Sequence, residues 1–600
     1  MASPKEEYEK RKFNYENAGI NITKSINLLS NLRLVLFVVG LTSAIYLYFL
    51  KMHYLSISLV VAFLIAFVLL VVKHRKLKYE KKYLATLYDI NRNALLRLAG
   101  EWKTFSDTGE DFKDENHNFS GDLDLFGKGS LFQFINTAQT FLGRIQLKND
   151  LTVPAQKANE IQTKQAAISE LATKVDWRQK FLAESMLAPE KMLDPQSLFV
   201  WAKSANDFYR ENWLKYLTRL SALTTMSLIL LHVVLNLVPL YVVLTMLGAQ
   251  YLMLLYRGNE RAEILNTVYP YNDNLKMYKK MLIVFEKAQF KTAYLKEMQT
   301  QVSGNKNHTA SMQIENLEKI VDWISNRNGS FFFVFNVLTL WDYHCINALE
   351  NWKKETDILL ENWVKVLAKL ESLSSLASIA YEQPDWVVPE IREGKPCFKA
   401  ESMGHPLLST RTSNNVNLEK PTQILLITGS NMSGKSTLLR TVGINLVLAY
   451  AGAPVCAQRF TCSIMDLYTC MRISDNLSNN ISSFYAELLR IKEVVKAAEE
   501  KENVFFLLDE IFKGTNSIDR HAGAKVLILK LCNKGALGLV STHDLELATL
   551  EEESKMKIKN YHFQEFYKNK EIYFDYILQP GVSKTRNALH LMRMAGIEVE

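Results

Sequence analysis

Residues 424–450, ILLITGSNMSGKSTLLRTVGINLVLAY, place a glycine-rich loop between an apolar run and a helical pattern. The apolar run at 424–428 is typical of a buried parallel strand, and residues 438–450 have the periodicity of a helix. A G-x4-G-K-[ST] loop in this setting presents backbone N–H groups and a helix N-terminus, both of which suit a polyphosphate. The stretch therefore predicts an α/β domain that binds a nucleoside triphosphate.

The loop itself supplies the candidate nucleotide-binding residues. They are Gly429, Asn431, Met432, Ser433, Gly434, Lys435, Ser436 and Thr437. Among them, Lys435 is expected to reach the β- and γ-phosphates, and the Ser436 hydroxyl is expected to ligate Mg²⁺. ATP and Mg²⁺ are therefore the predicted cofactors.

Two further apolar strands end in side chains that suit phosphate chemistry. Residues 504–508 run into Asp509 and Glu510, and residues 536–540 run into a Ser-Thr-His-Asp turn that contains His543. Phosphoryl transfer depends on positioning and charge neutralisation, so Asp509 is the expected carboxylate of the Mg²⁺ shell and Glu510 the group that orients the attacking water. His543 is a candidate sensor of the γ-phosphate, with a structural histidine as the alternative. We therefore predict an ATPase with Glu510 and His543 as catalytic residues.

These motifs, in this order and at this spacing, resemble the MutS family of DNA-repair ATPases. The matching segments are residues 429–437, 482–487, 508–520 and 541–543, with further matches at 404–406, 414–416 and 576–596. The resemblance covers residues 396–600 and extends with lower specificity to residues 123–154, which look like the start of the family's helical core.

The resemblance implies a homodimer in the broad class of ABC ATPases, with each ATP held between two subunits. It implies that Ser482 and Ser483 contact the γ-phosphate bound by the other copy, so that ATP binding closes the dimer and hydrolysis reopens it. It also implies DNA as a partner, in mismatch repair or a related transaction. Two departures stand out. Residues 1–85 replace the family's mismatch-reading domain, and Arg411 stands where an adenine-stacking aromatic is often found, which leaves adenine recognition open.

Two uncharged runs near the N-terminus predict a transmembrane hairpin. Residues 34–50 and 54–72 each cover most of a bilayer's hydrocarbon core at about 1.5 Å per residue. A buried soluble hairpin is the alternative. Because six Lys or Arg residues follow between 73 and 82, the positive-inside rule places the N-terminus and everything after Val72 in the cytoplasm. We expect a multi-pass protein of the plasma (inner) membrane with a cytoplasmic ATPase domain.

A third uncharged run, residues 220–256, predicts a second apolar hairpin. A single helix of this length would extend about 55 Å, which is too long for one span, so a turn at residues 236–239 is expected. A very apolar pair of core helices is the alternative. The shorter run at residues 331–341 is interpreted as core packing.

Composition and charge exclude several classes of protein. A chain of 600 residues with 48% hydrophobic and 22% charged residues is neither disordered nor a short disulfide scaffold. The net charge of +8 lies within residues 1–85, and the neutral remainder argues against a large nonspecific DNA footprint. The six cysteines form no C-x-x-C pair, which indicates buried or free thiols in a reducing compartment.

The expected fold is multidomain, α and α/β. Its expected segments are an N-terminal membrane hairpin with a basic flank (1–90), a helical core (91–219), a second apolar hairpin (220–256), a helical lever or return arm (257–395) and a P-loop, ABC-like ATPase domain (396–600). The expected function is that of a membrane-anchored, MutS-like homodimeric ATPase that couples nucleotide state to lever motion and engages DNA. The alternative is a membrane-remodelling or transporter-like motor of the ABC class without a DNA substrate.

Overall fold

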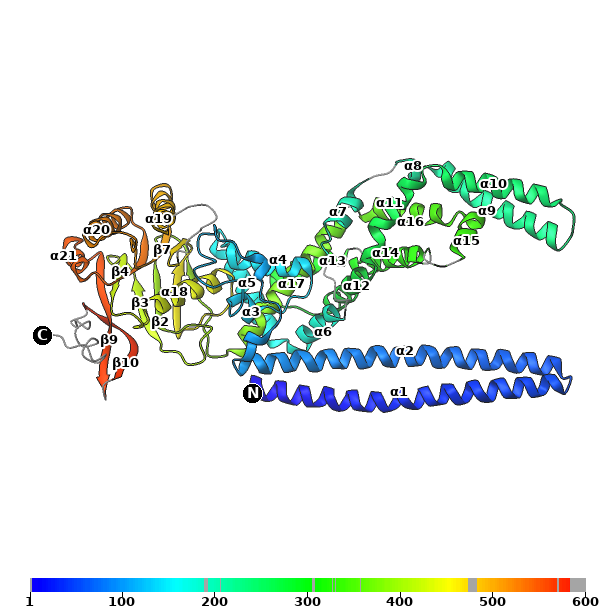
Figure 1. Cartoon of the computed structure of the whole chain (residues 1–600), viewed down its shortest axis with the longest axis horizontal. Coiled ribbons are helices and arrows are strands. Elements are labelled where there is room, and N and C mark those ends of the chain that lie inside the picture. The colour runs from blue at the N-terminus through cyan, green and yellow to red at the C-terminus, as the bar shows by residue number, and fades with distance from the viewer. Residues whose placement is uncertain are drawn as a thin grey trace.

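The computed structural model describes residues 3–187, 193–204, 207–304, 308–325, 327, 329, 331–356, 358–472, 483–568 and 571–582. Figure 1 shows an α/β domain at one end, a helical core in the middle, and two helical arms that extend from the core toward the other end. The chain is mostly helical, with a six-stranded and a four-stranded sheet in the α/β domain.

The helical core joins the arms to the α/β domain. Its α-helices, with those of the lever that continues from it, are α3 (Leu131–Ile135), α4 (Phe141–Thr152), α5 (Ala158–Thr173), α6 (Val175–Met186), α7 (Gln196–Lys203), α8 (Asp207–Arg210), α11 (Gly258–Val268), α12 (Asn272–Glu286), α13 (Ala293–Ser303), α14 (Ala310–Ser325), α16 (Trp341–Thr356) and α17 (Leu359–Glu382). Short 3₁₀ turns are η1 (Glu101–Thr104), η2 (Glu110–Phe112) and η3 (Tyr269–Tyr271). Helix α17 packs against α4, α5 and α13 and leads directly into the α/β domain, so it is the main structural link between the two.

The first arm is an antiparallel pair of long helices, α1 (Pro4–Phe49) and α2 (His53–Leu98). Each has 46 residues, or about 69 Å at 1.5 Å per residue. The two helices approach closely at Gly40: a Cβ atom at this position would lie only 2.8 Å from the Phe63 ring. The apolar side chains around this contact face outward, with 57 to 64% of the surface exposed at Leu34, Phe37, Leu64 and Leu69.

The base of the first arm is fixed to the core. Arg97 Nη1 on α2 lies 2.8 and 3.0 Å from the two carboxylate oxygens of Glu382, at the end of α17. The Tyr8 hydroxyl of α1 donates to the same carboxylate at 3.3 Å. All three side chains are buried. The arm is therefore attached through a polar network at the helix that enters the α/β domain.

The second arm ends in an apolar hairpin, α9 (Asn212–Val233) and α10 (Leu240–Leu255). Within the described residues, α1, α2 and α9 are long and apolar enough to cross a membrane, and a fourth span results if α10 and the helical stretch Gly258–Glu286, bent by 65°, count as one. In Figure 1 this hairpin and the far end of the first arm point toward the same end of the molecule.

Helix α15 (Phe332–Thr339) corrects one sequence interpretation. Residues 331–341 are not simply core packing, because Phe331, Phe333 and Val334 are 84, 64 and 56% exposed. The helix lies against α9 and α10, and the Phe333 and Tyr251 rings are 6.0 Å apart. The interpretation fails because the run is short and lies at the end of an arm, where no further layer of the described chain covers it.

The large sheet has strand order β10-β9-β4-β8-β7-β6. Its strands are β4 (Ile424–Thr428), β6 (Asp466–Cys470), β7 (Val504–Asp509), β8 (Leu537–Thr542), β9 (Ile558–Lys568) and β10 (Glu571–Pro580), and all are parallel neighbours except the antiparallel β9–β10 pair. The three strands predicted from sequence, β4, β8 and β7, are therefore adjacent. Their carboxyl ends meet at one edge, where Thr428 pairs with Thr542 and Asp509 with Ser541.

Helices and a smaller sheet surround the large sheet. The helical elements are α18 (Lys435–Tyr450), α19 (Ser483–Glu500), α20 (Ser517–Asn533), α21 (Leu550–Glu553) and η6 (Leu545–Thr549), and the smaller sheet, in order β1-β5-β2-β3, contains β1 (Glu390–Arg392), β2 (Phe398–Met403), β3 (Asn414–Leu418) and β5 (Arg459–Ser463). The six cysteines are free, and five of them are buried, which agrees with the sequence prediction.

Candidate functional site

The glycine-rich loop connects β4 to α18 at the carboxyl edge of the large sheet. Gly434 precedes the helix with a φ of 102°, in the left-handed region that favours glycine. Helix α18 begins at Lys435, so the N–H groups of its first turn have no acceptor within the helix. These N–H groups, with the positive end of the helix dipole, form the kind of surface that binds a phosphate.

The Lys435 side chain lies inside this loop. Its Nζ donates to the carbonyl oxygens of Gly429 at 2.9 Å and Ser430 at 2.8 Å. Glu510 Oε1 is 3.7 Å from the same Nζ, and His543 Nε2 is 3.4 Å away. Burial lowers the pKa of Lys435, and the carboxylates of Glu510 and Asp509 oppose that shift. The ammonium is thus held at the centre of the site.

Glu510 is held in place from several directions. Its φ is 51°, and its N–H donates to the Ser541 carbonyl at 3.0 Å. Its carboxylate lies 2.8 Å from His543 Nε2 and 3.0 Å from Lys513 Nζ. The hydrogen bond from His543, followed by that from Lys513, lowers the pKa of Glu510 to about 2, against the effect of burial. The carboxylate is therefore ionised at neutral pH and suits the orientation of a water molecule.

His543 links two of the predicted motifs. Its Nε2 is 2.8 Å from Asn431 Oδ1 in the loop and 2.8 Å from Glu510. With the proton on Nε2, the imidazole donates toward both oxygens. The structure thus brings together Asn431, Lys435, Glu510 and His543 from three separate segments.

Two oxygen donors are candidates for holding Mg²⁺, which prefers such ligands. Ser436 lies in the first turn of α18, and Asp509 ends β7. Asp509 Oδ1 accepts a hydrogen bond from the Ser541 hydroxyl, which orients the carboxylate. A hydroxyl and a carboxylate at the edge of a phosphate loop fit this ion, and their role as ligands stays a prediction.

A cavity of about 380 Å³ lies over the loop, within the size range of small-molecule sites. It is lined by the loop and α18 residues Asn431, Met432, Ser433, Gly434, Lys435, Ser436, Thr437, Leu438 and Thr441, and by Met403, His405, Leu408, Thr410, Arg411, Thr412, Asn414, Glu510, Phe563 and Tyr576. Arg411 Nη1 lies 3.0 Å from Cys456 Sγ, and the guanidinium is 5.8 Å from the Trp386 ring centroid. Burial lowers the pKa of His405 to about 4, so that side chain is neutral at pH 7.

Tyr576 is a lining residue to which sequence reasoning gave no role. It lies at an irregularity of β10 between Phe574 and Leu578, with a φ of 57°. Asn414 holds this bulge, because its side chain bonds the Tyr576 carbonyl at 3.0 Å and the Leu578 N–H at 2.7 Å. A Cβ on Gly434 would lie 3.1 Å from the Tyr576 ring, so the ring lies against the loop. No local pattern in the sequence indicates such a bulge.

The Ser-Ser-Phe motif lies at the start of α19. Ser482 falls outside the described residues, and the side chain of Ser483 is likewise not described, so their predicted contacts stay predictions. Farther along α19, Glu487 is buried and accepts a hydrogen bond from the Phe512 N–H, just after Glu510. A Cβ on Gly514 would lie 2.7 Å from Phe484 Cβ. The helix that carries the motif is therefore packed against the loop that follows β7.

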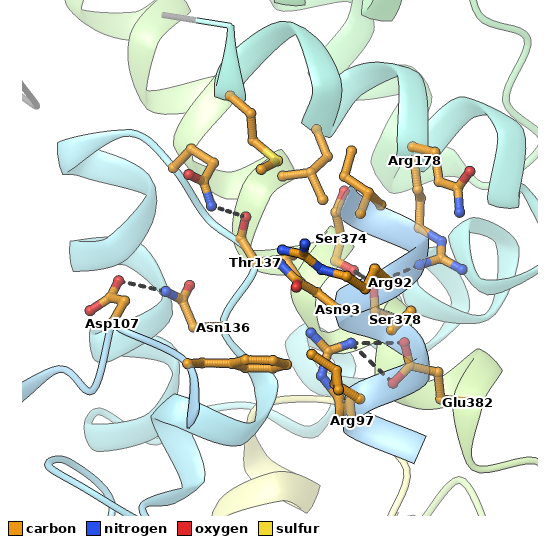
Figure 2. A pocket seen from close by; sticks show the side chains of 18 of the residues that line it. Arg92, Asn93, Arg97, Asp107, Asn136, Thr137, Arg178, Ser374, Ser378 and Glu382 are labelled. Atoms are coloured by element: carbon orange, nitrogen blue, oxygen red, sulfur yellow. Dashed lines mark hydrogen bonds and ion pairs between the residues drawn. The ribbon is translucent and has the colours of Figure 1, made fainter. Parts of the chain in front are cut away.

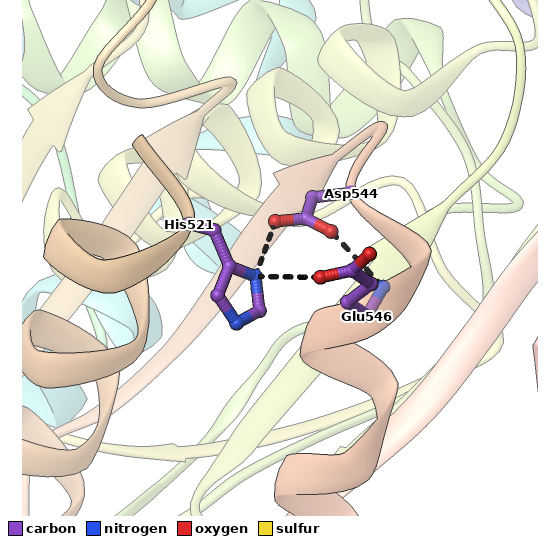
Figure 3. Close-up of side chains that lie close together, drawn as sticks. All are labelled: His521, Asp544 and Glu546. Atoms are coloured by element: carbon purple, nitrogen blue, oxygen red, sulfur yellow. Dashed lines mark hydrogen bonds and ion pairs between the residues drawn. The ribbon is translucent and has the colours of Figure 1, made fainter. Parts of the chain in front are cut away.

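Another contact fixes the segment that follows His543. His521 Nδ1 on α20 is 2.7 Å from Asp544 Oδ2 and 3.9 Å from Glu546 Oε2 (Figure 3). Exposed groups of this kind are common without a metal. Since Asp544 directly follows His543, the contact ties the histidine's segment to the helix that follows the Glu510 loop.

The core also contacts β6 and α18 of the α/β domain through a connector at residues 116–124. Asp122 accepts hydrogen bonds from the Thr469 hydroxyl at 2.6 Å and from the N–H groups of Met471 and Arg472 at 3.1 and 2.9 Å. A Cβ on Gly443 of α18 would lie 2.5 Å from Leu123. The helix that starts at the phosphate loop is thus in direct contact with the core.

Comparisons with known proteins point to one family. The model of MutS domain V matches residues 425–600. Over 253 residues, 41% of this chain, the sequence is 32% identical to the DNA mismatch repair protein MutS of Aquifex pyrophilus, covering 29% of that protein. The protein of the same name from Methanosarcina mazei is 30% identical over 248 residues, which is 40% of this chain and 27% of the relative. The matched part thus spans less than a third of the length of these relatives.

Proposed function

We propose that this chain, which belongs to the MutS family through its C-terminal domain, is a membrane-attached ATPase that converts nucleotide state into movement of its helical arms. The observation that carries the proposal is the cluster of Lys435, Glu510 and His543 beside a helix N-terminus and a cavity of about 380 Å³. A cation, an ionised carboxylate and an imidazole beside a helix N-terminus suit hydrolysis of a phosphoanhydride, which depends on charge neutralisation and on an oriented water.

Each side chain has a distinct role in the proposed reaction. Lys435 neutralises charge on the phosphates, and the first-turn amides of α18 hold them in place. Glu510 accepts a hydrogen bond from the attacking water and orients it. His543 fixes the orientation of Glu510 through the 2.8 Å contact. Mg²⁺, held by Ser436 and Asp509, supplies charge neutralisation when bound.

The Tyr576 ring offers a flat surface for the base of the nucleotide. It lines the cavity and lies against Gly434. Aromatic side chains stack on any base, so this contact favours a nucleotide over a free polyphosphate. Arg411 has no aromatic ring to stack on the base, so Tyr576 is our candidate for that role.

The proposed active unit is a homodimer in which Ser482 and Ser483 of one copy contact the γ-phosphate held by the other. The packing of α19 against the loop after Glu510 supports coupling between the two sites. Contacts of the 116–124 connector with α18 offer a route by which closure of the dimer moves the core and its arms.

The apolar arms support attachment to a membrane. The far ends of both arms point the same way (Figure 1), so a single bilayer accommodates both. The 26 residues of α2 after Val72 form a stalk of about 39 Å between the bilayer and the core. In this arrangement α15 is too short to span and enters one leaflet beside α9 and α10. The Lys- and Arg-rich start of the stalk favours a cytoplasmic ATPase domain at the plasma membrane.

DNA is the partner that the family favours, since the matched relatives are named DNA mismatch repair proteins. The charge balance argues for a restricted contact, because residues 86–600 carry no net charge. The second candidate function is a membrane motor without a DNA substrate, favoured by the exposed apolar side chains of the α1–α2 arm.

The test is ATP hydrolysis by the purified full-length protein in lipid nanodiscs. We expect Mg²⁺-dependent hydrolysis, and Lys435→Ala should weaken ATP binding at least tenfold because it removes the central cation. Lys525→Ala is the matched control, since Lys525 pairs with Glu553 away from the cavity. Equal ATP affinity in both variants would contradict the proposed site.

Mismatched, branched and single-stranded DNA separate the two candidate functions. Salt-dependent binding with stimulated hydrolysis supports the DNA role. If the protein hydrolyses ATP but binds none of these DNAs, and none of them stimulates hydrolysis, the result supports the motor without a DNA substrate.

A further inference from the structure

A second cavity, of about 390 Å³, lies at the base of the first arm, where α2, α6 and α17 meet (Figure 2). It is similar in size to the cavity at the phosphate loop and shares no lining residue with it. Its volume is within the range of small-molecule sites. Because the proposed ATPase does not use these side chains, the cavity calls for a separate explanation.

Two residues that line this cavity each carry a buried hydrogen-bond donor without an acceptor in the described chain. Arg97 is 6% exposed, and Glu382 pairs with its Nη1, yet its Nε has no partner among the described residues. Ser374, also 6% exposed, has a hydroxyl with no partner within the same part of the chain. Buried polar groups are rarely left unpaired, because each one costs its desolvation. A ligand with acceptor atoms would satisfy both.

Arg178 adds a buried positive charge. It is 5% exposed, and its guanidinium donates to the carbonyl oxygens of Leu171 and Ala172 and to the Ser378 hydroxyl. These acceptors are neutral, and no carboxylate of the described chain forms an ion pair with Arg178. A buried guanidinium surrounded only by neutral acceptors favours an anion nearby.

The acidic residues around the cavity are already paired. Asp107 is held by Arg144, with two contacts of 2.8 Å, and Glu382 is held by Arg97. Arg92, at the exposed rim, lies 3.2 Å from Asp89. Of the three arginines labelled in Figure 2, Arg92 and Arg97 are thus paired with carboxylates, which leaves Arg178 as the one without an ion-pair partner in the described chain.

We propose that this cavity binds a small, soluble, acceptor-rich anion of the size of a nucleotide or a phosphorylated metabolite. Its acceptors pair with Arg97 Nε and the Ser374 hydroxyl, and its charge faces Arg178. Such a ligand bridges α2 of the first arm and α17, the helix that enters the α/β domain. Binding therefore stabilises the joint between the arm and the core.

The position of the cavity argues against a lipid headgroup as the ligand. Arg97 is 25 residues beyond Val72, which corresponds to about 37 Å along α2. If the arm is embedded as proposed above, headgroups at the bilayer surface do not reach the cavity. This one step rests on the proposed membrane attachment, whereas the donor chemistry of the cavity does not.

The test measures binding of three probes, pyrophosphate, AMP and citrate, to the full-length Lys435→Ala protein in nanodiscs of neutral lipid. The Lys435 substitution weakens the phosphate loop, and the neutral lipid removes anionic headgroups. We expect at least one probe to bind once per chain and to raise the thermal unfolding temperature.

Two matched substitutions locate that binding. Asn93→Asp adds a negative charge to the cavity lining and should weaken binding at least tenfold, whereas Asn149→Asp on α4, outside the cavity, should leave it unchanged. Ser374→Ala should weaken binding about threefold by removing one donor.

Three results would overturn the proposal. They are failure of all three probes to bind, equal affinity in the Asn93→Asp and Asn149→Asp proteins, and displacement of the bound probe when anionic lipid replaces neutral lipid in the nanodiscs. The last result would identify a headgroup as the ligand. None of these outcomes depends on ATP hydrolysis, so failure here is distinct from failure of the proposed ATPase.

Discussion

The two ends of this molecule differ in which side chains they gather and which they expose. At the α/β end, Lys435, Glu510 and His543 lie together, and each has a partner from a distant segment. At the far ends of the arms, Leu34 and Phe333 are each 64% exposed, with no layer of the described chain over them. Water is a suitable solvent for the first surface and a poor one for the second. The described chain thus gathers charged side chains at the α/β end and exposes apolar ones on the arms, which is the observation behind the proposed membrane attachment.

The largest expected effect is at the α/β end. Glu510→Gln keeps the shape of the side chain but removes the charge that orients water, so hydrolysis should fall about 100-fold or more while ATP still binds. Single-turnover hydrolysis with separately measured ATP binding checks this. Glu553→Gln, on an exposed ion pair with Lys525, is the control. Normal turnover in the Glu510→Gln protein would contradict the water-orienting role proposed for Glu510.

The next effect concerns the arm ends. Arg33 Nη1 lies 2.9 Å from His74 Nδ1 across α1 and α2, so removing residues 35–72 and joining the helices with a short linker preserves their pairing. Combined with removal of residues 224–249 and with Phe333→Ser, this deletion should move the protein from the membrane fraction to the soluble fraction.

Hydrolysis should persist in the shortened protein, because the buried base of the arm is untouched. Flotation on a density gradient and a parallel ATPase assay measure the two ends independently. A shortened protein that still floats with lipid would mean that apolar exposure at the arms has another cause.

A smaller effect is expected at Tyr576. Tyr576→Ala should weaken ATP binding about tenfold, because base stacking contributes roughly 1 to 3 kcal/mol, while pyrophosphate binding should not change. Titration calorimetry with both ligands separates base from phosphate recognition. Tyr573→Ala, an exposed tyrosine of the same strand outside the cavity, is the control. Equal losses for ATP and pyrophosphate would argue for a structural role of the bulge.

A further expected effect is a pH dependence within the core that joins the two ends. Glu371 on α17 is buried and accepts hydrogen bonds from the Thr140 hydroxyl and the N–H groups of Gln139 and Thr140. Desolvation raises its pKa from 4.5 to about 7. The folded protein therefore holds a proton that the unfolded chain releases, and stability should fall as pH rises from about 4.5 to 7.

Glu371→Gln should flatten this dependence, measured as urea midpoints at pH 5 and 7. Glu361→Gln on the same helix is the control, because the hydrogen bonds from Lys203 and Lys365 lower its pKa, away from this window. If the urea midpoint of the Glu371→Gln protein still falls between pH 5 and 7, a group other than Glu371 causes the pH dependence.

Much of the α/β domain follows from local patterns. Apolar runs, glycines and a helical period predict β4, β7, β8 and α18, and the residues at the carboxyl ends of the strands follow from the parallel arrangement. The meeting of Asn431 with His543, 112 residues away, depends instead on the register of β4 against β8. Tyr576 escapes prediction because a bulge, which has no simple sequence signal, brings its ring to the loop.

The arms show the limits of reading apolar runs. The runs at 34–50 and 54–72 predict two helices, and the structure contains both within the longer helices α1 and α2. The run at 331–341 has similar composition, yet its exposure depends on where the arm ends. Burial is a property of neighbours, and a short apolar run carries no information about which neighbours it will have.

By itself, the sequence determined the glycine-rich loop, the strands beside it and the apolar helices of the arms, because backbone sterics and hydrophobic periodicity act between residues close in the chain. Tertiary structure alone decided which side chains meet: His543 with Glu510, Tyr576 against Gly434, and Arg97 with Glu382 beside the second cavity. Those meetings depend on strand register and helix packing over hundreds of residues, where many small contacts act together and no single local pattern specifies the result.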